Sequence, residues 1–246
     1  MGYHESLTEG RNAVLEAFRS GKTVDRLFVL DGCQDGPVKT ILREAKKQDT
    51  MVQYVKKERL DQLSETKNHQ GVIAYCAACE YAEVSDILEN AKKKGEAPFI
   101  VLLDGIEDPH NLGAIIRTAN QAGAHGVIIP KRRAVGLTAT VARTSAGAVN
   151  YTPVAKVTNL VTVMEDLKKE GMWFVCADMD GEEMYSLNLK GPIGLVIGNE
   201  GEGVSRLVKE HCDMVASIPM KGAIDSLNAS VAMGVLAYEI VRQRRF

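Results

Sequence analysis

The chain has 246 residues and a formal net charge of −2, with 45% hydrophobic and 25% charged residues. This composition is ordinary for a globular protein, and the length suits one large domain or two small ones. The near-zero charge excludes a strong overall attraction to nucleic acid, so any affinity for DNA or RNA has to come from local basic patches. No apolar run reaches the length of a membrane span, and residues 1–9 lack the basic and apolar regions of a signal peptide. We therefore expect a cytoplasmic protein without a membrane partner.

The five cysteines are scattered in the sequence, and their odd number fits reduced thiols better than a disulfide framework. The only close pair, Cys76 and Cys79, ends an apolar stretch rather than opening a helix. No second C-x-x-C pair and no H-x-x-x-H pair accompanies it. A zinc or redox site is an open alternative, but the pattern favours a structural role and no metal.

The first part of the chain alternates helix and strand patterns. The expected elements are a helix around residues 10–18, a strand at 27–30, a helix at 41–48, and strands at 51–55 and 72–75. This order predicts a small α/β domain over residues 1–78.

A polar segment with helical periodicity follows at residues 81–98 and ends in a proline. We expect a linker at residues 79–97. The basic run 92–94 could touch RNA, but a lysine cluster at a helix end is more typical of a solvated terminus favoured by the helix dipole.

From residue 99 onward, apolar strands recur with helical stretches between most of them. The expected strands are 99–103, 126–129, 172–177, 193–197 and 214–218. Near-continuous apolar strands separated by helices predict a buried parallel sheet, and hence an α/β domain over residues 98–246. The last stretch, from residue 227 to about 242, is apolar almost all round, so a subunit partner could cover it.

A first polar motif follows the expected strand 99–103 and reads D104-G-I-E-D-P-H-N111. Asn111 is well placed to cap a helix over residues 112–122. On that helix Arg117 lies about 100° from the apolar centre line, at a rim. A helix cap and a surface charge would be the structural alternative for these two residues.

A second motif, G198-N-E-G-E-G203, follows the expected strand 193–197. It lacks the lysine of a phosphate-binding loop, and Glu200 and Glu202 would repel a phosphate. The loop suits a neutral or cationic ligand such as S-adenosylmethionine, which carries a positive sulfonium and amine and no phosphate. A plain strand-to-helix turn is an equally weighted alternative for this loop alone.

A third motif spans residues 218–230, where Ser226 is a candidate helix cap and Asn228 falls in the expected first helical turn. The carboxyl ends of parallel strands meet at one edge of a sheet. Three such strand-loop-helix junctions therefore predict a common pocket at that edge.

In order and spacing, these motifs resemble those of the SpoU/TrmH family of SPOUT methyltransferases, over roughly residues 99–246. The amino-terminal part, with L7-x-E-G-x-N-A-V14 and H69-Q-G-V72, resembles the substrate-binding domain of the RlmB-type ribosomal guanosine 2′-O-methyltransferases. That domain is similar to ribosomal proteins of the L30e/L7Ae type.

The resemblance implies a deep trefoil knot in the carboxy-terminal domain and a homodimer formed partly through the last helix. It also implies site residues at the matching positions. Cofactor contacts would fall to backbone around Gly198, Ile218, Met220 and Leu227. The chemical site would gather Asn111, Arg117, Glu200, Ser226 and Asn228.

The resemblance thus implies an S-adenosylmethionine-dependent enzyme that methylates the 2′-hydroxyl of a guanosine ribose in 23S ribosomal RNA. A guanidinium is a poor base, so Arg117 is expected to clamp the RNA phosphate and stabilise the developing oxyanion, oriented by Glu200. The proton acceptor stays open between substrate phosphate and water. The alternatives are a tRNA methyltransferase of the same family and a non-enzymatic, ribosome-associated RNA-binding protein. A nucleotide-dependent oxidoreductase would need a G-x-G-x-x-G after the first strand, which is missing.

Basic residues near the motifs are candidates for RNA contact, with surface solubility as an equally weighted alternative for each. The candidates are Lys131, Arg132, Arg133 and Arg143 near the expected pocket, and Arg11 and His69, with Lys67, on the amino-terminal domain.

Overall fold

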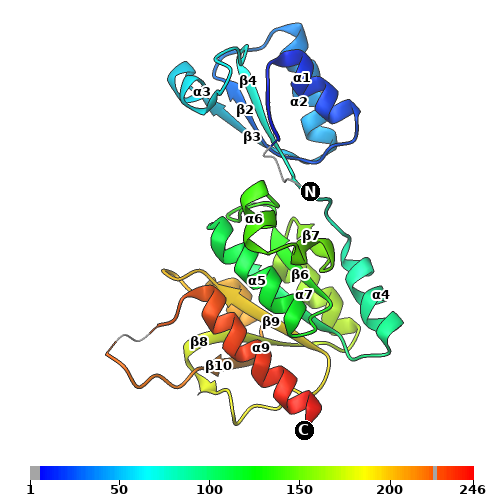
Figure 1. Ribbon diagram of the computed structural model, residues 1–246, viewed down its shortest axis with the longest axis vertical. Coiled ribbons are helices and arrows are strands. Elements are labelled where there is room, and N and C mark those ends of the chain that lie inside the picture. Colours follow the sequence, from blue (N-terminus) through cyan, green and yellow to red (C-terminus); the bar gives the residue numbers. More distant parts are fainter. Residues whose placement is uncertain (1–5, 224–225) are drawn as a thin grey trace. The chain divides into compact units, whose positions relative to one another are not determined.

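The computed structural model describes residues 6–223 and 226–246 (Figure 1). The chain divides into two compact units, the first made of residues 1–80 and 136–140, the second of residues 81–135 and 141–246. Each unit has its own sheet and is described by itself.

The sheet of the first unit has four strands in the order β1-β4-β2-β3. They are β1 (Ser6–Glu9), β2 (Val24–Leu30), β3 (Met51–Val55) and β4 (Val72–Cys76). Strand β4 runs antiparallel to β1 and to β2, whereas β2 and β3 are parallel.

Helices cover both faces of this sheet because successive strand residues point to opposite sides. Leu27 and Val29 of β2 pack with α1 (Arg11–Arg19) and α2 (Gly36–Lys47). Phe28, between them, packs with Leu60 of α3 (Lys57–Leu63). The expected elements of this unit are confirmed. Helix α2 begins earlier than expected because the Asp35 side chain caps it, accepting from the Val38 backbone N–H at 3.2 Å.

The sheet of the second unit has six strands in the order β10-β8-β9-β5-β6-β7, all parallel. They are β5 (Phe99–Asp104), β6 (Gly126–Pro130), β7 (Val154–Val157), β8 (Trp173–Glu183), β9 (Ile193–Gly198) and β10 (Met214–Ser217). The predicted buried parallel sheet is therefore confirmed. Strand β8 runs further than expected because its polar second half pairs with β10 past a register shift.

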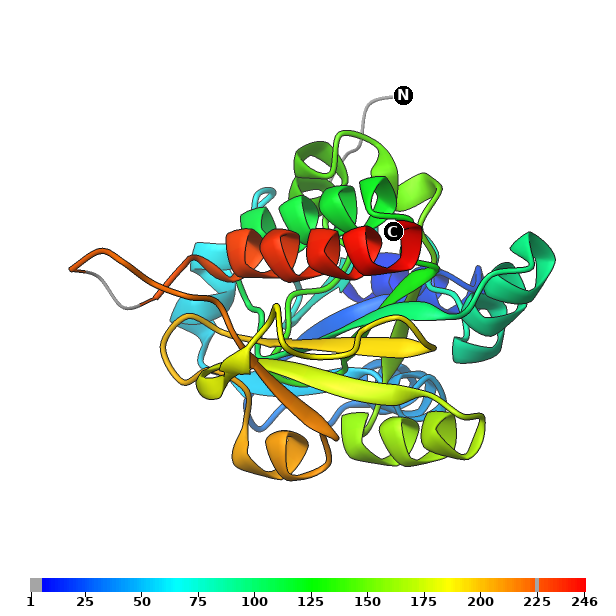
Figure 2. The ribbon, with the colours of Figure 1, turned by 90° about the horizontal axis from the view of Figure 1, so that it is seen from below.

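Helices also cover both faces of the second sheet (Figure 2). Helices α7 (Leu160–Lys169) and α8 (Arg206–Glu210) pack on one face. Helices α5 (Pro109–Gln121) and α9 (Ala229–Arg245) lie side by side on the other. A short helix α6 (Ala139–Thr144) and a 3₁₀ turn (Ala148–Asn150) lie between β6 and β7.

The segment expected as a linker at residues 79–97 is mostly a packed helix, α4 (Val84–Lys94), of the second unit. Ile87 of α4 is fully buried among core residues of this sheet, and a side chain at Gly126 would collide with it. The polar residues that suggested a linker are the solvent side of an amphipathic helix.

Helix α9 does not bury apolar side chains alone, because polar side chains also lie on its buried face. Gln243 is buried and bonds to the Leu189 backbone N–H at 2.8 Å and to the Leu187 carbonyl at 3.0 Å. On the opposite face Val231 and Tyr238 are about half exposed. Among the helices that the structure describes, none combines the length and apolarity needed to span a membrane.

Candidate active site

The candidate site lies at the edge of the second sheet where the parallel strands end. Asp104, the last residue of β5, is paired in register with Gly198, the last residue of β9. The loops that follow these strands, and the loop between β10 and α9, carry the three sequence motifs.

In the first motif the helix begins earlier than expected, so the predicted cap at Asn111 is wrong. Asp108 is the cap, and its carboxylate accepts from the His110 backbone N–H at 2.9 Å. Pro109 opens α5, where a missing N–H costs nothing. Asn111 lies in the first turn and is only 8% exposed, so its amide has to find a partner inside the site.

The second motif is a tight loop organised by the side chain of Asn199. Its Oδ1 accepts from the backbone N–H groups of Gly201 and Glu202 at 2.9 and 2.7 Å. A Cβ at Gly198 would lie 1.9 Å from the carbonyl carbon of Gly203, so only glycine allows the loop to close. Gly203 has a φ of 68°, the left-handed region that glycine adopts freely.

In the third motif the cap is Asn228, and the predicted cap at Ser226 is wrong. Asn228 Oδ1 accepts from the Ser230 backbone N–H at 3.0 Å and from its hydroxyl at 2.6 Å. Ser226 lies two residues before the cap and is exposed.

One hydrogen-bonded cluster joins the three motifs through Asn111, Glu200 and Asn228. Asn111 Nδ2 donates to Glu200 Oε1, and Asn228 Nδ2 donates to the same oxygen at 3.2 Å and to Asn111 Oδ1 at 3.0 Å. Residues far apart in the sequence thus fix the three loops to one another. The carboxylate accepts from two amide donors through one oxygen, which fixes its orientation.

Arg117 lies on the same helix, six residues beyond Asn111, or roughly 9 Å along the helix axis. It is exposed, as the predicted rim position requires. The expected pairing with Glu200 does not occur. No hydrogen bond or ion pair of Arg117 is found in the described part of the chain, and Glu200 bonds to the two asparagines instead.

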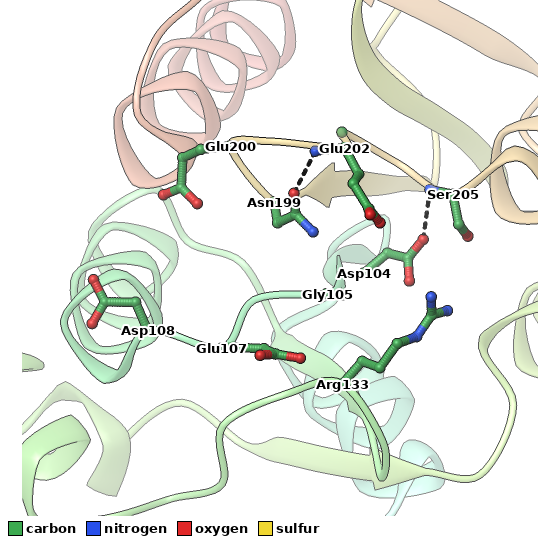
Figure 3. Close-up of a pocket in the computed structure, with 10 residues that line it drawn as sticks. Asp104, Gly105, Glu107, Asp108, Arg133, Asn199, Glu200, Glu202 and Ser205 are labelled. Atoms are coloured by element: carbon green, nitrogen blue, oxygen red, sulfur yellow. Dashed lines mark hydrogen bonds between the residues drawn. The ribbon is translucent and has the colours of Figure 1, made fainter.

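A pocket of about 530 Å³ opens beside this cluster (Figure 3). The carboxylates around it belong to Asp104, Glu107, Asp108, Glu200 and Glu202, and Arg133 brings the opposite charge. Asp104 is buried and holds the glycine loop by accepting from the Ser205 backbone N–H at 2.8 Å. The sequence analysis did not place Asp104 or Glu107 in the site; the available signal was their position at the end of β5 and in the turn that follows it.

The residues expected to contact the cofactor lie on the second and third loops. Gly198 is buried at the end of β9, Ile218 and Leu227 are partly buried, and Met220 is 38% exposed. The glycine loop closes through backbone, and the fixed carboxylate of Glu200 belongs to it. A backbone loop with a carboxylate where a phosphate-binding loop has a lysine fits a cationic, phosphate-free cofactor.

The basic residues after β6 separate into different environments. Arg133 has a φ of 53° and lines the pocket, and Arg132 is exposed. Lys131 is partly buried, and Arg143 is exposed on α6.

The two candidates on the first unit are held in local contacts. The Arg11 guanidinium lies 2.6 Å from Asp35 Oδ2 and donates to the Gln70 carbonyl at 3.1 Å. His69 is only 7% exposed; its Nε2 lies 3.0 Å from Asp61 Oδ1, and its Nδ1 accepts from the Gly71 backbone N–H at 3.0 Å. Both residues therefore shape the loop before β4.

Comparison with known proteins assigns a class to this fold and site. Residues 98–238 match the SpoU rRNA methylase family, and residues 7–82 match the family described as RNA 2′-O ribose methyltransferase substrate binding. The protein is an α/β enzyme of the S-adenosylmethionine-dependent RNA 2′-O-ribose methyltransferases.

The chain belongs to the SpoU/TrmH family. It is 49% identical over 237 residues to YacO of Bacillus subtilis (strain 168), named as a TrmH family tRNA/rRNA methyltransferase; the match covers 96% of this chain and 94% of that protein. A Staphylococcus saprophyticus protein named in the same way is 45% identical, covering 98% and 97%.

Solved structures agree with this assignment. The SpoU methyltransferase AviRb of Streptomyces viridochromogenes, in complex with the cofactor AdoMet, superposes with a TM-score of 0.62 at 27% identity, covering 98% of this chain and 91% of that one. An AdoMet-bound rRNA methyltransferase of Sinorhizobium meliloti superposes with a TM-score of 0.60 at 25% identity, covering 96% and 86%.

Proposed function

We propose that this enzyme methylates the 2′-hydroxyl of a guanosine in 23S ribosomal RNA, as the RlmB-type enzymes do, in the cytoplasm. The observation that carries the proposal is the cluster of Asn111, Glu200 and Asn228, which fixes three loops around one place next to unpaired charged groups. A separate amino-terminal unit that matches a substrate-binding family supplies a second surface for a large RNA.

The bound cofactor supplies a methyl group activated by the positive sulfur to which it is attached. The loops after β9 and β10 hold it through backbone around Gly198, Ile218, Met220 and Leu227. Glu200, fixed by two amides, would supply a negative charge that favours a cationic cofactor on these loops.

The protein residues then position the ribose. Glu200 uses Oε1 for the two asparagine amides, so Oε2 is available to a ribose hydroxyl. Arg117 has no partner within the described residues, and its planar fork suits a phosphate and the oxyanion that develops at the 2′ position. Ser226 is exposed two residues before the cap of α9, and its hydroxyl would bind the same ribose.

We further propose that residues 1–78 form an RNA-binding domain of the L30e/L7Ae type and that residues 98–246, together with α4, form a knotted catalytic domain. Two copies pair through the exposed face of α9, where Val231 and Tyr238 are 49% and 51% exposed. Sedimentation of the purified protein tests the dimer, and Tyr238→Glu should shift it toward monomer.

Mapping of 2′-O-methyl groups on RNA from cells with and without the gene tests the substrate. We expect one methylated guanosine of 23S RNA to disappear with the gene and to return when the purified enzyme and S-adenosylmethionine are added. Loss of a tRNA mark alone would assign the enzyme to tRNA.

A further inference from the structure

The pocket beside the cluster holds charged side chains that the protein itself leaves unpaired. Within residues 6–223 and 226–246, no hydrogen bond or ion pair is found for the carboxylates of Glu107 and Glu202 or for the guanidinium of Arg133. Elsewhere on this unit exposed acids and bases pair readily, as Arg206 does with Glu210 at 2.7 Å. The unpaired carboxylates and the unpaired guanidinium of this pocket are therefore available to a ligand that carries both hydrogen-bond donors and acceptors.

A buried carboxylate marks the floor of the same pocket. Asp104 is 6% exposed, and one of its oxygens accepts from the Ser205 backbone N–H. Its other oxygen has no partner among the described residues. Figure 3 shows Asp104, Glu202 and Arg133 pointing into the same space. This oxygen is not among the buried polar atoms that lack a partner, so it faces the open pocket and can accept from a ligand that carries N–H groups.

The pocket is contiguous with the place proposed for the ribose, at Glu200. Glu200 lines the pocket and is also the centre of the asparagine cluster. Glu202 follows two residues later on the same loop, and its backbone is fixed by Asn199 Oδ1 at 2.7 Å. A nucleotide whose ribose lies at Glu200 therefore has its base within reach of Glu202 and Arg133.

The chemistry of the lining discriminates among the four bases. Guanine presents two adjacent donors, N1–H and the N2 amino group, and carries acceptors at O6 and N7. A carboxylate accepts both donors at once, and arginine donates to O6 or N7. Adenine, cytosine and uracil each have an acceptor, a ring nitrogen or a carbonyl oxygen, next to their donor. When one carboxylate oxygen accepts from that donor, the other carboxylate oxygen is repelled by the neighbouring acceptor.

We propose that this pocket binds the guanine base of the target nucleotide, with Glu202 accepting from N1–H and N2–H and Arg133 donating to O6. The volume of about 530 Å³ is ample for one base taken out of its stack. The inference rests on the proposed function, which places the ribose at Glu200, and it adds the residues that select the base.

The first experiment identifies the methylated nucleoside without any assumption about its position. Total RNA from cells lacking the gene is incubated with the full-length enzyme and deuterated-methyl S-adenosylmethionine, digested, and analysed by mass spectrometry. The label is expected only in 2′-O-methylguanosine. Label in another nucleoside overturns the guanine pocket while the methyltransferase assignment stands; no label at all overturns the proposed function itself.

The second experiment replaces the target guanosine by inosine, which lacks the N2 amino group and keeps N1–H and O6. For the wild-type enzyme kcat/KM should fall by about 10- to 100-fold, the usual effect of losing one hydrogen bond to a charged group. Glu202→Gln should bring the two substrates to within about threefold, because the charge that reads the amino group has been removed.

Glu107→Gln is the matched control, since it removes the same charge from the same pocket. It should leave the ratio of guanosine to inosine at its wild-type value, and S-adenosylmethionine binding should be unchanged in both variants. Equal rates on inosine and guanosine for the wild type overturn the proposal. An unchanged ratio in Glu202→Gln, or an equal collapse in both variants, overturns the assignment to Glu202.

Discussion

The loop before β4 in the first unit and the strand edge that forms the site in the second unit differ in how their charged side chains are partnered. At the loop of the first unit, Glu9 and Arg11 are paired internally. The Glu9 carboxylate accepts from the Thr66 hydroxyl at 2.8 Å and the Glu65 backbone N–H at 2.7 Å, and Arg11 pairs with Asp35. In the second unit Arg117, Arg133 and Glu202 have no partner within the part of the chain that the structure describes. Paired charges hold a loop in shape, whereas unpaired charges at a strand edge are available to substrate.

The loop of the first unit shows what such pairing holds in place. Lys67 and Gln70 adopt φ values of 57° and 50°, a region that costs a non-glycine residue energy. Glu9 accepts from the Thr66 backbone N–H, just before Lys67, and Arg11 donates to the carbonyl of Gln70 itself. The hydrogen bonds also hold the pKa of Glu9 below its usual value, against the opposing effect of burial. We infer that this loop is preformed before RNA arrives.

The largest expected effect comes from a substitution that prevents the glycine loop of the second unit from closing. Gly198→Val should abolish S-adenosylmethionine binding, because its side chain would overlap the backbone of Gly203. Gly201→Ala is the control in the same loop, where a Cβ meets only Asn199 Oδ1 at 3.7 Å. Calorimetry should give wild-type affinity for the control. Unchanged affinity in Gly198→Val would reject the cofactor assignment.

Removing the first unit should separate recognition from chemistry. A fragment of residues 81–246 retains α4 and the whole six-stranded sheet, so it should fold and bind S-adenosylmethionine. Its methyl transfer to ribosomal RNA should fall by about 100-fold or more, the scale of losing several phosphate contacts. A fragment as fast as the full chain would show that residues 1–80 are not the substrate-binding unit.

A small, pH-dependent effect on the stability of the fold is expected at His125, which lies outside both the loop before β4 and the pocket. Burial lowers the pKa of this fully buried histidine, against the opposing hydrogen bond from Glu96. The folded state thus keeps the ring neutral where the unfolded chain, with an ordinary pKa near 6.5, takes up a proton. Stability should be constant above about pH 6.5 and fall as the pH decreases below it. Thermal melts of His125→Gln should show a weaker fall; an identical slope would exclude His125 as a cause.

Much of this arrangement follows from local sequence, and the rest depends on tertiary contacts. Apolar runs such as residues 99–103 are sufficient to predict the buried parallel strands. The helix starts were misplaced because Asp108 and Asn111, or Ser226 and Asn228, are equally good caps locally. Burial of Asn111 against Glu200 decides the first case, and sequence spacing does not show it.

Tertiary contacts also decide which charged side chains are paired. Arg11 and Arg133 are equivalent basic residues in the sequence, but the fold places Asp35 at 2.6 Å from Arg11 and places Arg133 in a pocket. Whether a positive charge is already neutralised depends on residues brought together by folding. RNA-binding roles can therefore be suggested, but not ranked, from sequence.

The contrast between paired and unpaired arginines is tested most directly by measuring unfolding and catalysis for Arg11→Ala and Arg117→Ala side by side. Arg11→Ala should lower the unfolding midpoint of the first unit by about 4–8 °C, as expected for a loss of roughly 1 kcal/mol in a unit of this size, while kcat at saturating RNA stays near wild type. Arg117→Ala should leave the midpoint and S-adenosylmethionine affinity unchanged and lower kcat by about 100- to 1000-fold. Arg117→Lys should fail as well, because an ammonium lacks the planar fork. A stable Arg117→Ala enzyme with near-normal kcat, or an Arg11→Ala enzyme that loses catalysis without losing stability, would contradict the account.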